Sequence, residues 1–204
     1  MTQELLFPEA VEEIIDIGRF ASQRGWVPAT AGNFSRRLDE KHAVITRSGV
    51  DKGALRPQDI VAVAIAEPAP KGVSAETPLH LARYRASNDI GAVLHVHTIA
   101  GTVLSRRHAA QGELRLYGYE MHKALDFTTH ESELVIPVFE NMQDTMELAR
   151  RVEERLAAAS SVPGYLLAGH GLYAWGATMA AAKRHLEALE FLLSCELEER
   201  RLGK

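Results

Sequence analysis

In the stretch Ile90-Gly-Ala-Val-Leu-His-Val-His97, an apolar run ends in a His-x-His pair. A short apolar run of this kind predicts a buried β-strand, and side chains alternate between the two faces of a strand. His95 and His97 are therefore expected on one face, and Leu94 and Val96 on the other. Two imidazoles side by side on a rigid element are half of a metal site, although two separately satisfied histidines would give the same pattern.

A third imidazole is available at His170, in the segment Ala168-Gly-His-Gly-Leu172. The glycines on both sides let the backbone turn tightly and approach a ligand closely. Taken alone, His170 indicates only a histidine in a turn. Two rigid histidines and one from a turn leave a fourth position open, and this pattern is typical of catalytic rather than structural zinc.

The bulk composition limits the class of protein. The 204-residue chain is 46% hydrophobic and 25% charged, which suits a single domain over residues 1–204. A net charge of -4 offers no basic surface for nucleic acid. No apolar stretch approaches the ~20 residues that span a membrane, and we expect no secretory signal. The single cysteine, Cys195, excludes an intrachain disulfide and indicates a cytoplasmic protein.

Hydrophobic periodicity and turn residues divide the chain into helices and strands. Helices are expected at residues 9–25, 74–87, 99–108, 145–159 and 178–200, the second with Ser74 as its N-cap. Strands are expected at 42–47, 60–66, 90–97 and 134–139, with two more in 164–176 and a small-residue loop at 27–35. Helices around a several-stranded sheet predict a single three-layer α/β/α domain.

Two polar loops and a helix start offer a place for phosphate. Hydroxyls, amides and glycine backbone groups gather at residues 30–35, 46–49 and 74. Such concave clusters can hold phosphate without a P-loop, although plain turn chemistry explains each of them separately. The candidate phosphate-binding residues are Thr30, Asn33, Ser48, Gly49 and Ser74.

Two carboxylates are candidates for acid–base chemistry. Glu76 stands at a helix start, where an acid also complements the helix dipole. Glu120 lies among aromatic residues in Leu116-Tyr-Gly-Tyr-Glu-Met-His122. Apolar surroundings raise the proton affinity of a carboxylate, which suits a general acid or base. The local sequence around Glu120 nevertheless favours a surface glutamate.

The order of these motifs resembles the class II aldolase and adducin family. The series is Gly32-Asn-Phe-Ser35, Thr46-Arg-Ser-Gly49, Ser74-Ala-Glu76, His95-Val-His97 and His170, and it covers nearly the whole chain. The resemblance implies a central, mainly antiparallel sheet. It also implies a homotetramer with active sites near subunit interfaces, and one Zn²⁺ per subunit held by His95, His97 and His170.

The resemblance also implies the chemistry. The substrate is expected to be a ketose phosphate, with Glu120 as acid/base because it lies in a Glu-Met-x-Lys context. Family aldolases use the acid at the Glu76 position, so the division of labour between the two carboxylates stays open. Ala75 replaces a second serine and no tyrosine follows the last helix, which favours a dehydratase. The alternatives are a sugar-phosphate aldolase, a 4-epimerase and a non-catalytic, adducin-like scaffold.

Overall fold

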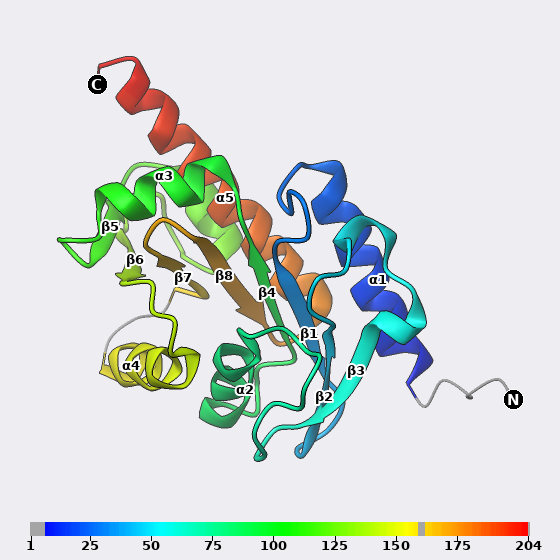
Figure 1. Ribbon diagram of the computed structural model, residues 1–204. Helices are drawn as coiled ribbons and strands as arrows, with labels where there is room; N and C mark the ends of the chain where they lie inside the picture. Colours follow the sequence, from blue (N-terminus) through cyan, green and yellow to red (C-terminus); the bar gives the residue numbers. More distant parts are fainter. Residues whose placement is uncertain (1–6, 159–161, 204) are drawn as a thin grey trace, which may run out of the picture.

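The computed structural model describes residues 7–158 and 162–203, and one eight-stranded sheet runs through them (Figure 1). The order of the strands across the sheet is β3-β2-β1-β4-β8-β7-β6-β5. Only β6 and β7 pair in parallel, which confirms the expected mainly antiparallel sheet. The strands are β1 (Asn33–Arg37), β2 (His42–Thr46), β3 (Ile60–Ala64), β4 (Ala92–Val96), β5 (Glu113–Leu116), β6 (Leu134–Phe139), β7 (Gly164–Leu167) and β8 (Gly171–Gly176).

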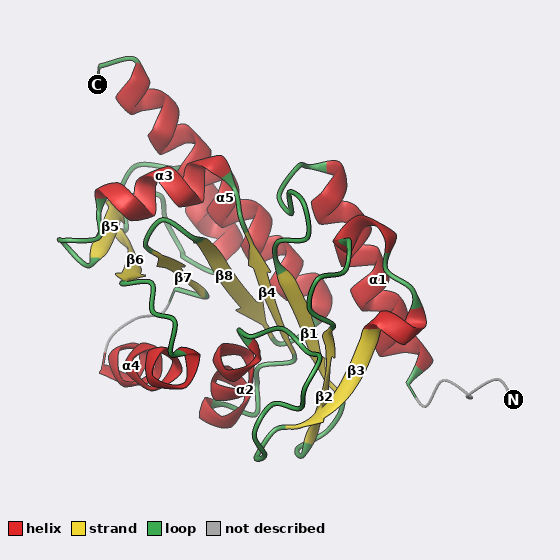
Figure 2. Cartoon of the chain, in the orientation of Figure 1, coloured by secondary structure: helices red, strands yellow, loops and turns green. Residues whose placement is uncertain are grey.

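Helices cover both faces of this sheet, so the predicted three-layer architecture is confirmed (Figure 2). One face packs against α1 (Pro8–Gln23), α3 (Ile99–Arg107) and α5 (Met179–Arg201). The other face packs against α2 (Thr77–Ala86) and α4 (Thr145–Ala158). The described residues also form three short 3-10 helices, η1 (Lys52–Ala54), η2 (Pro57–Asp59) and η3 (Glu120–Leu125).

The alternation of side chains along β4 decides which residues face each of the two helix layers. Leu94 and Val96 belong to the core on the α1 and α5 side, and Val93 belongs to the core on the α2 and α4 side. His95 follows Val93 by two residues, so it shares the face that looks toward α2. The predicted separation of the histidines from Leu94 and Val96 is therefore confirmed.

The last helix, expected at residues 178–200, is confirmed as α5. The hydroxyl of Thr178 caps α5 by accepting a hydrogen bond from the backbone N–H of Ala181. The apolar face of α5, formed by Leu186, Leu189 and Leu193, is fully buried against the sheet. No helix within residues 7–158 and 162–203 is both long and apolar enough to cross a bilayer.

Several expected boundaries are wrong. The loop predicted at 27–35 ends in β1, which pairs with both β2 and β4, and β5 lies where no strand was expected. Helix α2 begins at Thr77, three residues after Ser74, because the backbone first makes a separate turn from Ser74 to Thr77. Helix α1 ends at Gln23 rather than Gly25. The predicted end of α4 at Ala159 lies outside the described residues.

Candidate metal centre

The His-x-His pair lies in the middle of the sheet. Strand β4 is flanked by β1 and β8, so His95 is fully buried, and His97 follows directly after the strand. The backbone N–H of His97 donates to the carbonyl of Trp26 at 2.9 Å, which fixes the chain where β4 ends. The Nε2 atoms of His95 and His97 lie 2.8 Å apart.

The third imidazole comes from the turn between β7 and β8. Gly169 has φ of 67°, a left-handed conformation that favours glycine. A Cβ atom on Gly171 would lie 2.1 Å from the carbonyl oxygen of Val96, so only glycine allows this approach of the turn to β4. The two glycines therefore bring His170 to the pair, with its Nε2 atom 3.0 Å from that of His97.

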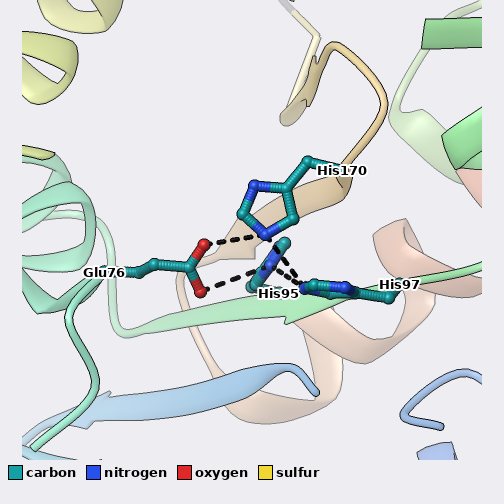
Figure 3. Close-up of side chains that lie close together, drawn as sticks. All are labelled: Glu76, His95, His97 and His170. Atoms are coloured by element: carbon teal, nitrogen blue, oxygen red, sulfur yellow. Dashed lines mark hydrogen bonds and ion pairs between the residues drawn. The ribbon is translucent and has the colours of Figure 1, made fainter. Parts of the chain in front are cut away.

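Glu76 completes the cluster from the segment just before α2 (Figure 3). Its Oε1 atom lies 2.9 Å from Nε2 of His170, and its Oε2 atom lies 3.5 Å from Nε2 of His95. The four candidate ligand atoms of Glu76 and the three histidines all lie within 4.8 Å of one another. Elements far apart in the sequence thus direct one carboxylate and three imidazoles at a common point.

The protonation states of the side chains in the cluster favour the binding of a cation. Burial lowers the pKa of His95 to about 3 and that of His97 to about 4, so both imidazoles are neutral near pH 7. Burial alone would raise the pKa of Glu76, but the His95 and His170 imidazoles outweigh it and the pKa lies well below its ordinary value. The carboxylate is therefore ionised beside the neutral imidazoles of His95 and His97.

Outer contacts orient the rings in the way that metal ligands require. Nδ1 of His95 lies 3.1 Å from the carbonyl oxygen of Leu172, which accepts a hydrogen bond only if Nδ1 carries the proton. The lone pair of Nε2 then points into the cluster. Nδ1 of His170 similarly faces Oδ1 of Asn141 at 3.3 Å. Converging lone pairs, an ionised carboxylate and these supporting acceptors together fit a divalent metal ion.

A pocket of about 320 Å³ opens beside the cluster. Its lining includes every residue proposed for phosphate, namely Thr30, Asn33, Ser48, Gly49 and Ser74. Two cations also line it, Arg47 and Lys52. Lys52 is fully buried, and its ammonium donates to the carbonyls of Thr30 at 2.8 Å and Val50 at 2.7 Å. Apolar side chains also line the pocket, among them Leu79, Met142 and Leu148.

Asn33 forms a direct hydrogen bond to the cluster, which its sequence context did not indicate. Its Nδ2 atom donates to Oε2 of Glu76 at 2.6 Å and to Oγ of Ser74 at 3.1 Å. Both amide hydrogens are therefore engaged inside the protein. A phosphate group held by this side chain would have to replace one of these two hydrogen bonds.

Glu120 lies elsewhere on the chain. It begins η3, its side chain is 69% exposed, and it pairs with Lys123 at 2.9 Å and His130 at 3.9 Å. The hydrogen bond from Lys123 lowers the pKa of this carboxyl, which is the opposite of the shift that apolar surroundings would give. Within one chain, the structure brings Glu76 to the histidines and leaves Glu120 at the surface.

Comparison of the sequence with known protein families identifies the family of this chain. The sequence pattern of the "Class II Aldolase and Adducin N-terminal domain" matches residues 12–197. The chain belongs to the class II aldolase and adducin family. The resemblance that the ordered motifs indicated is therefore confirmed.

Family members with closely similar sequences share one name. A protein of Parvibaculum lavamentivorans named methylthioribulose-1-phosphate dehydratase is 51% identical over 200 residues, which cover 98% of each chain. A protein of Sorangium cellulosum with the same name is 50% identical over 95% of this chain and 93% of its own length. Among solved structures, L-fuculose-1-phosphate aldolase from Thermus thermophilus is 29% identical, with a TM-score of 0.75 over 95% of this chain and 96% of its own.

Proposed function

We propose that this chain is a methylthioribulose-1-phosphate dehydratase of the methionine salvage pathway, acting in the cytoplasm. It would convert 5-methylthioribulose 1-phosphate to 2,3-diketo-5-methylthiopentyl 1-phosphate and water. The observation that carries the proposal is the cluster of three imidazoles and Glu76 beside a pocket with two cations. Similarity over almost the whole length to relatives of that name supports the choice of substrate.

We assign one Zn²⁺ per subunit to His95, His97 and His170. A bound zinc ion would supply electrophilic stabilisation for the negative charge that develops on the C2 oxygen when C3 loses its proton. The rigid position of His95 and His97 at the end of β4 supports this assignment, because a substrate must be held in one plane for the C3 proton to be removed.

The phosphate group is assigned to the polar side of the pocket. Thr30, Asn33, Ser48, Gly49 and Ser74 are the proposed ligands, with the cations of Arg47 and Lys52 nearby. A dianionic group held there would fix the C1 end of the substrate and set the distance from C3 to the catalytic carboxylates. Charge complementarity supports this arrangement.

The reaction needs one proton removed and one supplied. Loss of the C3 proton gives an enediolate, whose electrons expel the C4 hydroxyl as water once that hydroxyl has taken up a proton. The resulting enol tautomerises to the 2,3-diketone. The ionised carboxylate of Glu76, next to the imidazoles, is suited to accept the C3 proton. Glu120 is the proposed acid at C4.

Glu120 can serve this role only if a neighbouring copy of the chain delivers it, because within one chain it pairs with Lys123 at the surface. We therefore propose a homotetramer with active sites near subunit interfaces. Ile99 and Val103 support an interface close to the site, since both lie on α3 just after His97 and are 75% and 44% exposed. Neighbouring exposed apolar side chains of this kind favour association.

A sugar-phosphate aldolase or 4-epimerase is the second candidate, favoured by the structural similarity to L-fuculose-1-phosphate aldolase. These enzymes would act on the C3–C4 bond rather than the C4 hydroxyl. The complete set of histidines opposes the third candidate, a non-catalytic scaffold.

The deciding experiment incubates the zinc-loaded protein with a panel of ketose phosphates and identifies the products by NMR. We expect the diketone from 5-methylthioribulose 1-phosphate, and no product from a His170→Ala control. Release of an aldehyde would instead establish cleavage of C3–C4. Absence of both reactions in a zinc-loaded protein would contradict the proposed function.

A further inference from the structure

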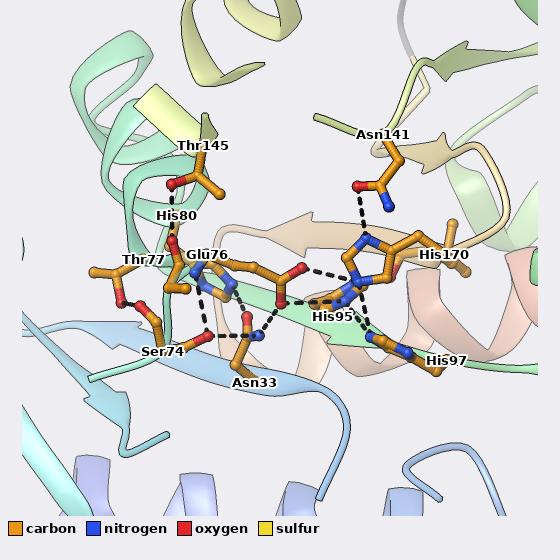
Figure 4. Close-up of polar contacts among 12 residues, drawn as sticks. Asn33, Ser74, Glu76, Thr77, His80, His95, His97, Asn141, Thr145 and His170 are labelled. Carbon is orange, nitrogen blue, oxygen red and sulfur yellow. Dashed lines mark hydrogen bonds and ion pairs between the residues drawn. The ribbon is translucent and has the colours of Figure 1, made fainter. Parts of the chain in front are cut away.

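A series of hydrogen-bonded polar side chains leads inward from Glu76, and Figure 4 shows its first members, Asn33 and His80. The amide of Asn33 contacts Glu76 on one side, and its Oδ1 atom lies 2.5 Å from Nε2 of His80. Nδ1 of His80 lies 2.7 Å from Oγ of Ser35, which in turn lies 2.8 Å from the phenolic oxygen of Tyr84. His80, Ser35 and Tyr84 are all at most 1% exposed, and the proposed reaction uses none of them.

The hydrogen bonds that link these side chains can run in only one direction. The NH₂ group of Asn33 donates to Oε2 of Glu76 and to Oγ of Ser74, so its Oδ1 faces Nε2 of His80 as an acceptor. Nε2 of His80 is therefore the protonated nitrogen. Burial lowers the pKa of His80 to about 4, so its ring is neutral near pH 7 and Nδ1 has no proton.

The hydrogen-bond directions of the Ser35 and Tyr84 hydroxyls follow from this tautomer of His80. With Nδ1 as an acceptor, the hydroxyl of Ser35 must donate to His80. The single hydroxyl hydrogen of Ser35 is then used, so the hydroxyl of Tyr84 must donate to Ser35. Every hydrogen in this series therefore points toward Glu76.

We propose that His80 is a positioning residue, which holds the Asn33 amide in one orientation and thereby aims the Glu76 carboxylate at the metal centre. The amide of asparagine is nearly symmetric in shape, so packing alone does not select between its two orientations. The flipped orientation would place Oδ1 of Asn33 against the Glu76 carboxylate, where two acceptors repel each other. The N–H of His80 opposes the flipped orientation from the other side of the amide, because a flipped amide would present NH₂ to a donor.

The first test reads the tautomer directly and needs no substrate. In zinc-loaded protein with ¹⁵N-labelled histidine, the His80 ring, assigned by its absence in His80→Gln, should carry its proton on Nε2 from pH 6 to pH 9. A proton on Nδ1, or a cationic ring in this range, would overturn the proposal. This measurement is independent of which reaction the protein catalyses.

The second test rests on the proposed function, with Glu76 acting at C3. His80→Leu removes both ring nitrogens, and we expect kcat to fall about 10- to 100-fold, as misorientation of a reacting group does, with zinc content unchanged and KM within a few fold. His80→Gln keeps a donor and an acceptor, so it should recover most of kcat.

A matched control is His185→Leu, which removes another buried histidine on α5 that bonds the carbonyl of Trp175. Wild-type kcat in folded, zinc-loaded His80→Leu, or an equal loss of kcat in His185→Leu, would overturn the positioning role. If the wild-type protein dehydrates no ketose phosphate, the proposed function fails, and the tautomer measurement still decides the hydrogen-bond chain.

Discussion

A buried carboxyl group on α5 should make the stability of this protein depend on pH. Glu190 is 3% exposed, and Oγ1 of Thr98 donates to its Oε1 at 2.7 Å. Thr98 directly follows the His-x-His pair and also caps α3 by accepting from the N–H of Gly101. Burial raises the pKa of Glu190 from 4.5 to about 7, because the interior disfavours its charged form.

The sign and size of the effect follow from this pKa. Between pH 4.5 and 7, the unfolded chain has released the Glu190 proton while the folded chain still holds it. The free energy of unfolding therefore falls as the pH rises through this window and levels off above it. At about 1.4 kcal/mol per pH unit, the window corresponds to a loss of about 3.5 kcal/mol.

Glu190→Gln tests this reasoning, because glutamine keeps an acceptor for Thr98 and does not titrate. Urea denaturation of both proteins, prepared without metal, would be followed from pH 5 to pH 8. We expect the stability of the variant relative to wild type to increase by about 2.5 kcal/mol across this range. A relative stability that stays constant with pH would refute the assignment of a neutral, buried Glu190.

Three further predictions concern the site. His97→Ala should lose both bound metal and activity, as metal analysis and turnover would show, whereas full activity in a metal-free variant would exclude the metal mechanism. Glu120→Gln should retain zinc but lose about 10²–10⁴-fold in kcat, and near-normal turnover would move its role to Glu76. Lys52→Met should destabilise the protein by about 2 kcal/mol, because the carbonyls of Thr30 and Val50 lose a buried donor, and an unchanged urea midpoint would contradict this.

The cluster of histidines could be predicted because its signals are local. Alternation along β4 puts His95 and His97 on one face, and the flanking glycines of His170 mark a turn that can approach a strand. Strand β1 gave no such signal. Its first residues follow a run of small, turn-forming residues. It is a strand because it pairs with β2 on one side and with β4, about sixty positions later, on the other.

The role of Asn33 was hidden for the same reason. In the antiparallel register, Asn33 stands opposite His95, so the pairing of β1 with β4 brings this amide to the metal centre. A loop at this position would leave Asn33 free to bind phosphate, as the sequence indicated. The contact to Glu76 is a consequence of strand register, which the local pattern of residues around position 33 does not contain.

Glu120 shows a different limit of prediction from a single sequence. The local sequence favoured a surface glutamate, and within one chain that is where it lies, with 69% of its side chain exposed. Its proposed catalytic role comes from the family resemblance and requires a second copy of the chain. No pattern within a single sequence predicts which surface residue enters a neighbouring subunit's site, because that depends on how the subunits pack.

The choice between water loss and carbon–carbon cleavage therefore cannot lie in the metal cluster itself. The fold is shared with a protein named as an aldolase, and both reactions need charge stabilised on the C2 and C3 oxygens. They differ at C4, where cleavage takes a proton from the hydroxyl and dehydration gives one to it. Glu76 is aimed at the imidazoles and is ionised, which suits proton removal at C3. The residue that stands beside C4 must therefore decide the reaction, and a neighbouring subunit's Glu120 is the group whose substitution should reveal it.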